Sequence, residues 1–397
     1  MHDGVLIVGA GPVGMVAARY LAGEGIPVTV IESAPTLPRD LRASTFHPPT
    51  LEMLERFGAT EYCISQGLIC PLWQFRDRTE GAIATFDLSV LADETPHPYR
   101  VQCEQWRVTE FLRDSLVEYP HAEIRFGCQA LEVRQDSEHV YLTVEQDGER
   151  EELRAGFLIG ADGASSSVRQ SLGIEFEGMT IPETFLTMST TFDFQKVFPD
   201  LADIAYLSDP KEWLVLLRTK SVWRVLFPTS GETDEQITDP TRVEERLQSV
   251  YRRDEPYEVV HTTAYRVHER VAKQYQMGRA FLVGDAAHIN NPLGGMGMNG
   301  GIHDAVNLAE KLTQHWKDPT LSVESLGRYE RQRRKVAIDT VQAQALRNRQ
   351  ILNTAEPAKR QAYYDDLRAT VDDLDRHRAY LMRTSLIQSL RDLEAIE

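Results

Sequence analysis

VLIVGAGPVGMVAARYLAGEGIPVTVIE, residues 5–32, is the stretch of sequence that decides the fold. It opens with the short apolar run Val5–Val8, passes through closely spaced glycines into a helical pattern, and ends in a second apolar run at residues 28–31. This order predicts a strand, a tight turn, a helix and a parallel strand. Such a unit opens a doubly wound α/β sheet.

Gly9, Gly11 and Gly14 have the spacing of a dinucleotide-binding turn. In such a turn the glycines permit a tight bend, a close approach of the backbone to a pyrophosphate and close packing of the helix on the strand. The helix N-terminus then faces the phosphates. Glu32 ends the second strand, where a carboxylate binds both hydroxyls of a ribose. The stretch therefore predicts dinucleotide binding, and it leaves NAD and FAD both open.

Two later segments repeat the pattern of a strand that ends in a glycine-rich turn. GADGASSSVR, residues 160–169, and GDAAH, residues 284–288, each place an aspartate at the carboxyl end of a strand. Ligands bind at these strand ends in open α/β sheets, so Asp162 and Asp285 are candidate cofactor residues. For either aspartate alone, an Asx turn is the structural alternative.

The loop PLGGMGMN, residues 292–299, runs directly into a predicted helix. Its small residues let the backbone approach a planar ring closely. The helix N-terminus offers N–H groups to the anion that develops at the edge of a reduced flavin. The loop therefore predicts cofactor contacts from Gly295, Gly297, Met298 and Asn299.

The sequence pattern changes between about residues 181 and 266, where short runs of aromatic and β-branched residues replace the alternation of predicted strands and helices. Runs at 213–218 and 222–227, joined by Thr-Lys-Ser, predict a hairpin. We therefore expect an α/β fold with a discontinuous Rossmann-like FAD- or NAD-binding domain (1–73, 98–180 and 267–320). The inserted β-rich substrate domain would comprise 74–97 and 181–266, followed by C-terminal helices over 321–397.

The composition excludes several classes of partner. A net charge of −17 over 397 residues would repel nucleic acid from most of the surface. The sequence contains no run of 18 apolar residues, so we expect no membrane span. The N-terminus lacks the pattern of a signal peptide. The four cysteines match no zinc or redox spacing, so we expect no metal and a cytoplasmic location.

The three glycine- and aspartate-containing motifs, in this order, resemble the class A flavoprotein monooxygenases, the para-hydroxybenzoate hydroxylase-like family. The resemblance extends over nearly the whole chain. It implies FAD as cofactor, NADH or NADPH as co-substrate, and hydroxylation of a phenolic or hydroxylated N-heterocyclic compound with O2 through a C4a-hydroperoxyflavin. No basic residue directly follows Glu32, which favours NADH. A monomer or homodimer is expected.

The same likeness implies roles for individual residues around the cofactor. Asp285 would bind the ribityl and pyrophosphate region of FAD, while Asp162 and Arg169 would serve FAD and the approaching nicotinamide nucleotide. Arg42 matches the family arginine near the pyrophosphate. Gln105 matches the glutamine or arginine near the flavin.

Catalytic and substrate-binding residues are predicted in two places. By resemblance, the Pro292 backbone lies beside the oxygen-bearing C4a atom, and Tyr206 takes the position of the tyrosine that contacts the substrate phenol. A half-buried sheet tyrosine is the structural alternative. In the β-rich segment, Arg218 and Arg224 are the other polar groups expected to face a ring-binding pocket.

Two alternatives remain open at the level of sequence. An FAD-dependent reductase or halogenase would share the nucleotide-binding core, although no WxWxIP-like segment supports a halogenase. The second alternative is a non-catalytic flavin-fold binding protein; the intact Asp162 and Asp285 motifs speak against it, and a yellow purified protein that bleaches rapidly on reduction would exclude it. The sequence leaves open the aromatic substrate and the position that is hydroxylated.

Overall fold

A six-stranded sheet organises the N-terminal part of the protein in this computed structural model, which describes residues 3–39, 43–318 and 320–397. Its strand order is β18-β19-β12-β1-β2-β8, and the strands from β19 to β8 run parallel. The strands are β1 (Val5–Val8), β2 (Val28–Glu32), β8 (Ala122–Phe126), β12 (Phe157–Gly160), β18 (Gln276–Met277) and β19 (Ala280–Leu282). The predicted α/β class is confirmed.

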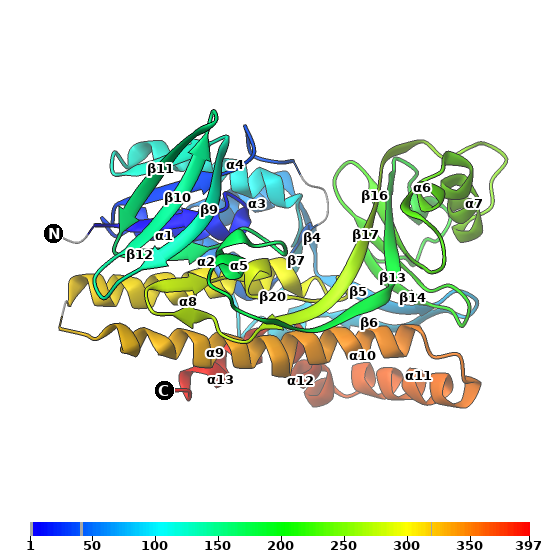
Figure 1. Cartoon of the computed structure of the whole chain (residues 1–397). Helices are drawn as coiled ribbons and strands as arrows, with labels where there is room; N and C mark the ends of the chain where they lie inside the picture. Colours follow the sequence, from blue (N-terminus) through cyan, green and yellow to red (C-terminus); the bar gives the residue numbers. More distant parts are fainter. Residues whose placement is uncertain (1–2, 40–42, 319) are drawn as a thin grey trace.

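Helices and a small sheet pack around this central sheet. The helices α1 (Pro12–Gly23) and α8 (Met296–Lys317) pack against each other, and their apolar residues share one core with the sheet. An antiparallel sheet of β9 (Cys128–Gln135), β10 (Val140–Gln146) and β11 (Glu149–Ala155) lies in front of it in Figure 1. The remaining elements of this part are α2 (Pro48–Glu55), α3 (Ala59–Gln66), α4 (Gln105–Ser115), α5 (Ser167–Ser171), β3 (Thr45–Phe46), β4 (Leu68–Cys70) and β7 (Arg100–Gln102).

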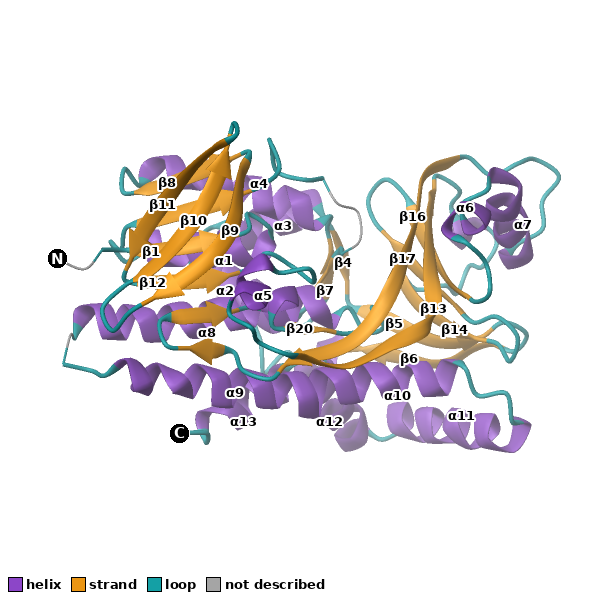
Figure 2. Cartoon of the chain, in the orientation of Figure 1, coloured by secondary structure: helices purple, strands orange, loops and turns teal. Residues whose placement is uncertain are grey.

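An eight-stranded sheet forms the second layer of the molecule, with the order β20-β17-β13-β16-β15-β14-β5-β6. Its strands are β5 (Leu72–Asp77), β6 (Gly81–Asp87), β13 (Phe176–Thr190), β14 (Ile204–Ser208), β15 (Leu214–Arg218), β16 (Trp223–Thr229), β17 (Val259–Ala272) and β20 (His288–Ile289). The predicted hairpin is the antiparallel pair β15–β16. The long strands β13 and β17 of this sheet curve toward the N-terminal part of the protein in Figure 2, and the predicted domain boundaries fall inside them.

The two faces of this sheet bury different sets of side chains because successive residues of a strand point to opposite faces. One face, with Leu214, Leu216 and Val225, packs on α6 (Asp234–Ile237) and α7 (Pro240–Val250). The opposite face carries Tyr206 and Val215. This second face is the one that meets the cofactor domain.

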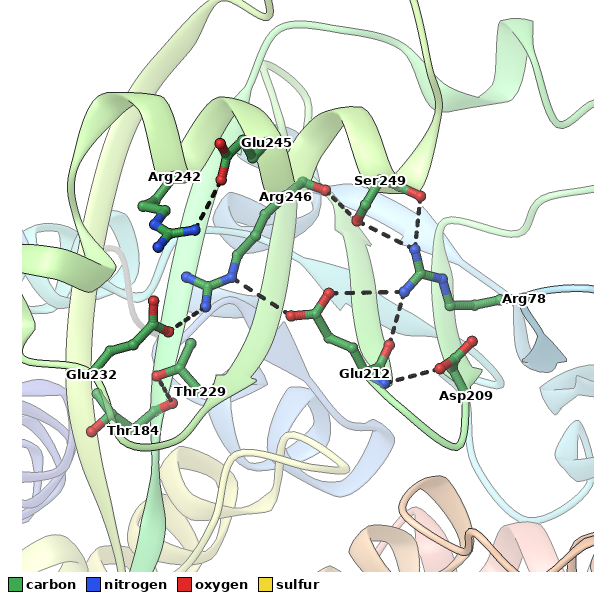
Figure 3. A network of polar contacts seen from close by, with 10 residues as sticks. All are labelled: Arg78, Thr184, Asp209, Glu212, Thr229, Glu232, Arg242, Glu245, Arg246 and Ser249. Atoms are coloured by element: carbon green, nitrogen blue, oxygen red, sulfur yellow. Dashed lines mark hydrogen bonds and ion pairs between the residues drawn. The ribbon is translucent and has the colours of Figure 1, made fainter.

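A network of ion pairs and hydrogen bonds ties α7 to the sheet (Figure 3). Arg246 on α7 pairs with Glu232 at 2.6 Å and reaches Glu212 at 3.6 Å. Arg78, which follows β5, donates to the backbone carbonyls of Glu212 at 2.9 Å and Ser249 at 2.7 Å. The network holds α7 on the face away from Tyr206, so it supports the sheet without entering the site.

The C-terminal helices run beneath both sheets in Figure 1. They are α9 (Arg328–Val336), α10 (Ala343–Leu352), α11 (Pro357–Asp372), α12 (Leu374–Thr384) and α13 (Ile387–Glu394), with a π-helical segment Ala337–Gln342 between α9 and α10. Side chains of α10 to α12 share a core with the Tyr206 face of the sheet. Within the described residues, no helix is both long enough and apolar enough to cross a membrane.

Candidate active site between the two sheets

The turn between β1 and α1 requires its glycines. Gly9 has a φ of +104°, and a Cβ there would lie 2.4 Å from the carbonyl oxygen of Ala161. A Cβ on Gly14 would lie 1.9 Å from the carbonyl oxygen of Gly9. By contrast, nothing lies within 4 Å of a Cβ built on Gly11. Gly11 therefore leaves open space in front of the N-terminus of α1, where a phosphate group can approach the backbone.

Glu32 is held in place at the end of β2. Its Oε2 accepts a hydrogen bond from the Ala10 backbone N–H at 2.9 Å, and its Oε1 accepts one from Ala34 at 2.8 Å. A carboxylate oxygen can accept more than one hydrogen bond, so both oxygens remain able to bind ribose hydroxyls. The fixed carboxylate lines the cavity described below.

The carboxylate of Asp162 stabilises its own loop while the residue lines the cavity. Its Oδ1 accepts from the Ser166 hydroxyl at 2.5 Å, and its Oδ2 accepts from the Ser167 hydroxyl at 2.9 Å and from the Val168 N–H at 3.2 Å. The Asx-type turn, which the sequence offered as the structural alternative, is therefore present in a residue that also lines the cavity.

Arg169 joins two cofactor loops from behind. Its guanidinium donates to the carbonyl of Ala286 at 2.9 Å and to that of Ala164 at 2.8 Å, and the residue is buried. It is not part of the cavity wall. The structure thus places Arg169 as a clamp between the Asp162 and Asp285 loops, away from the position expected for a direct contact to a nucleotide. Asp285 itself is exposed to the cavity.

The loop before α8 is held in place by hydrogen bonds to the N–H and to the carbonyl of one residue, Gly294. Gly294 donates its N–H to the Tyr206 hydroxyl at 3.1 Å. The Gly294 carbonyl contacts Nε2 of His47 at 2.9 Å, so this ring nitrogen carries the hydrogen. Gly294 and Gly295 have φ values of +100° and +66°, which glycine adopts at no steric cost. The sequence motif did not include His47, and no local pattern marks it.

Asn299 fastens the start of α8 to β3. Its side chain accepts from the His47 N–H at 2.9 Å and donates to the carbonyls of Thr45 at 2.8 Å and Gly295 at 2.6 Å. It is fully buried and does not line the cavity. The predicted role of Asn299 in cofactor binding is therefore an indirect one, through the position of the helix.

A single continuous cavity of about 620 Å³ connects these elements with the eight-stranded sheet. The predicted residues on its wall are Gly9, Gly11, Glu32, Gln105, Asp162, Tyr206, Arg224, Asp285, Pro292, Gly295, Gly297 and Met298. Gly14 packs behind the turn, and Arg42 lies outside the described residues. Residues that were predicted from segments far apart in the sequence therefore meet around one space.

The sheet side of the cavity is mostly apolar. Tyr206 pairs with Val215, Val215 with Leu226 and Leu226 with Thr187, so these four side chains form one row across four strands. All four line the cavity. Burial raises the pKa of Tyr206, so its hydroxyl stays protonated near neutral pH. This row and the Pro292 loop line the same cavity.

The two predicted substrate arginines lie on opposite faces of the sheet. Arg224 on β16 is buried and lines the cavity. Arg218, at the end of β15, instead pairs with Asp203 at 3.3 Å and contacts Gln195, away from the cavity wall. The expectation for Arg218 is corrected by the strand alternation, because its neighbour Leu217 is the residue that faces the cavity.

FAD fits the site that these residues form. Two helix N-termini, of α1 and α8, meet the cavity, and the space in front of Gly11 is the kind that a pyrophosphate requires. Glu32 would hold the adenosine ribose, and Asp285 would hold the ribityl and pyrophosphate region. Pro292, Gly295, Gly297 and Met298 would lie along the flavin ring.

The sequence and the structure both match known flavoproteins. Residues 3–344 match the family described as FAD binding domain. The para-nitrophenol 4-monooxygenase of Pseudomonas sp. strain WBC-3 is 35% identical over 367 residues, which cover 90% of this chain and 89% of that protein. The 6-hydroxy-3-succinoylpyridine 3-monooxygenase HspB of Pseudomonas putida strain S16 is 30% identical, with 95% and 96% covered. The crystal structure of p-nitrophenol 4-monooxygenase PnpA from Pseudomonas putida DLL-E4 superposes with a TM-score of 0.91 at 30% identity, covering 98% of each chain.

Proposed function

This chain belongs to the FAD-binding family of class A flavin-dependent aromatic monooxygenases, and on that premise we propose that its substrate is a small, single-ring phenol or hydroxypyridine. FAD is its cofactor and NAD(P)H its co-substrate. We also propose that NADH is the preferred electron donor and that the protein is a cytoplasmic monomer or homodimer. The relatives are named monooxygenases, so a reductase, a halogenase or a non-catalytic binding protein is not favoured.

The proposal rests on the side of the cavity that the eight-stranded sheet forms, opposite the Pro292 loop. This side presents an apolar row with one hydroxyl, from Tyr206, and one buried cation, from Arg224. The cavity of about 620 Å³ also has to hold FAD, which limits the space left for a substrate beside the sheet. The names of two relatives, a para-nitrophenol and a hydroxypyridine monooxygenase, agree with a single hydroxylated ring.

Bound FAD supplies the redox chemistry, in which it accepts a hydride from NAD(P)H and activates dioxygen. The residues of the chain bind the ring, orient it and keep water away from it. The apolar side chains of the row, Val215 and Leu226, exclude water from the space beside the ring. Tyr206 fixes the ring by its oxygen substituent, which directs the neighbouring carbons toward the flavin side of the cavity.

A substrate screen tests the proposal. Purified protein with bound FAD is mixed with NADH, O2 and single-ring phenols or hydroxypyridines, and NADH oxidation is measured together with hydroxylated product. The proposal predicts that some of these compounds stimulate NADH oxidation and give product in near-equal amounts. If every compound that stimulates oxidation gives only hydrogen peroxide, while polycyclic phenols give product, the proposed substrate class is wrong.

A further inference from the structure

Glu269 on β17 is a buried carboxyl group that binds the start of the Pro292 loop. The residue is 4% exposed and is not part of the cavity wall. Its Oε1 accepts two hydrogen bonds from Asn291, one from the backbone N–H at 2.9 Å and one from the side-chain amide at 2.6 Å. Asn291 itself lines the cavity. A single carboxyl oxygen therefore connects the eight-stranded sheet to the loop.

The strand register brings Glu269 to this place. β20 ends at Ile289, which pairs with Arg270 of β17, so the chain enters the loop beside Glu269. Successive residues of a strand point to opposite faces, and Glu269 shares its face with Val267. Val267 belongs to the core on the Tyr206 face of the sheet. The carboxyl group therefore lies on the face of the sheet that meets the cofactor domain.

Pro292 has a hydrogen-bonded anchor on each side. On one side Asn291 is bound by Glu269, and the Oδ1 of Asn291 accepts from the Leu293 N–H at 3.0 Å across the proline. On the other side is Gly294, with the hydrogen bonds described above. Proline has no N–H of its own to donate, so the position of Pro292 depends on these neighbours. Loss of either anchor should let the loop move relative to the cavity.

The carboxyl group of Glu269 does not need a charge for this contact. The nearby cation, Arg349 on α10, already forms an ion pair with Glu183, whose two carboxylate oxygens lie 2.5 and 2.6 Å from its Nη2. Oε2 of Glu269 is buried and has no hydrogen-bond partner among the described residues, so a negative charge there would be costly. Burial raises the pKa of Glu269, although the hydrogen bonds from Asn291 and the charge of Arg349 act in the opposite direction. The arrangement favours the uncharged carboxylic acid.

We propose that Glu269 is a positioning residue for the flavin, whose acceptor oxygen acts through Asn291 to fix the Pro292 loop against the ring of bound FAD. This inference rests on the FAD site described above and goes beyond the proposed substrate class. The role requires a hydrogen-bond acceptor of the right length at position 269, and it requires no negative charge.

The test compares two replacements of Glu269 in the FAD-containing protein, without substrate. Glu269→Met keeps the length of the side chain and removes the acceptor, whereas Glu269→Gln keeps an acceptor oxygen and cannot ionise. The visible absorption and circular dichroism of the flavin and its midpoint potential are measured. Glu269→Met should change the spectra and the potential, and Glu269→Gln should retain those of the parent. Hydrogen exchange of residues 290–296, followed by mass spectrometry, should be about tenfold faster in Glu269→Met, because the Asn291 N–H loses its partner.

Two further variants separate this role from a general loss of structure. Glu177→Ala removes a half-exposed carboxyl group from the neighbouring strand β13, and it should leave the flavin spectra and the exchange unchanged. Asn291→Ala removes the amide through which Glu269 acts. It should change the flavin spectra in the same direction as Glu269→Met, and Glu269→Met should have a smaller effect in the Asn291→Ala background than in the parent.

Several results would overturn the inference. One is a Glu269→Gln protein whose flavin spectra differ from those of the parent, since the charge would then matter more than the acceptor. Another is a Glu269→Met protein with the parent's spectra or the parent's exchange, and a third is an equal effect of Glu269→Met in both backgrounds. If Glu269→Met cannot be purified with FAD, Glu269→Gln and Asn291→Ala decide: the first must match the parent and the second must not.

These measurements use no aromatic compound, so the two proposals fail separately. If single-ring phenols are hydroxylated but Glu269→Met leaves the flavin unchanged, the proposed function stands and the role of Glu269 falls. If Glu269→Met alters the flavin as expected but no phenol or hydroxypyridine yields product, the proposed substrate class falls and the role of Glu269 remains.

Discussion

Replacing Tyr206 with phenylalanine tests the link between the substrate wall and the flavin loop. The change removes one oxygen atom that accepts the Gly294 N–H at 3.1 Å. The aromatic ring stays, so the contacts with Trp73 and Phe75 are kept. The expected effects therefore come from the lost hydrogen bond.

The magnitude follows from what is left unpaired. A buried donor without a partner costs about 1–3 kcal/mol. The Gly294 N–H loses its partner, so the free energy of unfolding should fall by roughly 1–3 kcal/mol. Domain stabilities are about 5–15 kcal/mol, so the variant should still fold and bind FAD.

The assay compares stability and coupling in the same preparation. Tyr206→Phe should retain FAD and accept hydride from NADH, because its hydroxyl takes part in neither step. Product per NADH should fall and hydrogen peroxide should rise, since the ring is less well oriented while the loop near Pro292 is loosened.

His47→Leu is the matched comparison for the loop. It removes the other hydrogen bond to the Gly294 peptide without changing the cavity wall. It should lower stability by a similar amount and raise peroxide, yet leave the affinity for substrate close to that of the parent. The reasoning is refuted if Tyr206→Phe keeps both the parent's unfolding free energy and its ratio of product to NADH.

Two other changes address the cofactor site, and a third addresses a buried ion pair outside the cavity wall. Glu32→Ala should weaken FAD binding by about 1.5–3 kcal/mol, which flavin fluorescence titration measures, because a charged acceptor for the ribose is lost; an unchanged dissociation constant would contradict the assignment. Asp285→Ala should be purified largely without flavin, and full flavin absorbance would refute its role. Asp304→Asn should lower stability by about 3–5 kcal/mol, because Arg333, which bonds Asp304 at 2.6 Å, would be left buried without its partner. Burial opposes ionisation of Asp304, but His288 and Arg333 hold its pKa below the usual range. The contribution of this carboxylate is therefore complete at neutral pH and is lost as the pH falls below about 4, so unfolding measured against pH should show a larger acid loss for the parent than for Asp304→Asn.

Local patterns predicted the elements of the fold well. The stretch at residues 5–32 forms β1, α1 and β2, and the predicted hairpin is the pair β15–β16. The helix predicted to follow the loop at residues 292–299 is α8, which begins within that loop at Met296. These elements follow from hydrophobic periodicity and glycine spacing, which depend on neighbouring residues alone.

Individual contacts were harder to predict than positions. The sequence predicted that Asp162 and Arg169 serve the cofactor. In the structure Asp162 lines the cavity and stabilises its own turn, whereas Arg169 joins two loops behind the cavity wall. Both side chains follow a strand in the same motif, so spacing could not tell which would face the cavity. Their roles depend on the backbone carbonyls and hydroxyls that the folded loops bring within reach.

The sequence by itself determined that this chain builds a dinucleotide site from three separated motifs, because glycine spacing and strand ends are properties of short segments. Only the tertiary structure decided which side chains meet across the cavity. Arg218 and Arg224 were equal candidates until the register of β15 and β16 placed them on opposite faces. His47 carries no local signal, and it reaches Gly294 only because distant segments pack together. Contacts of this kind are set by the packing of the whole chain, which no short stretch of sequence contains.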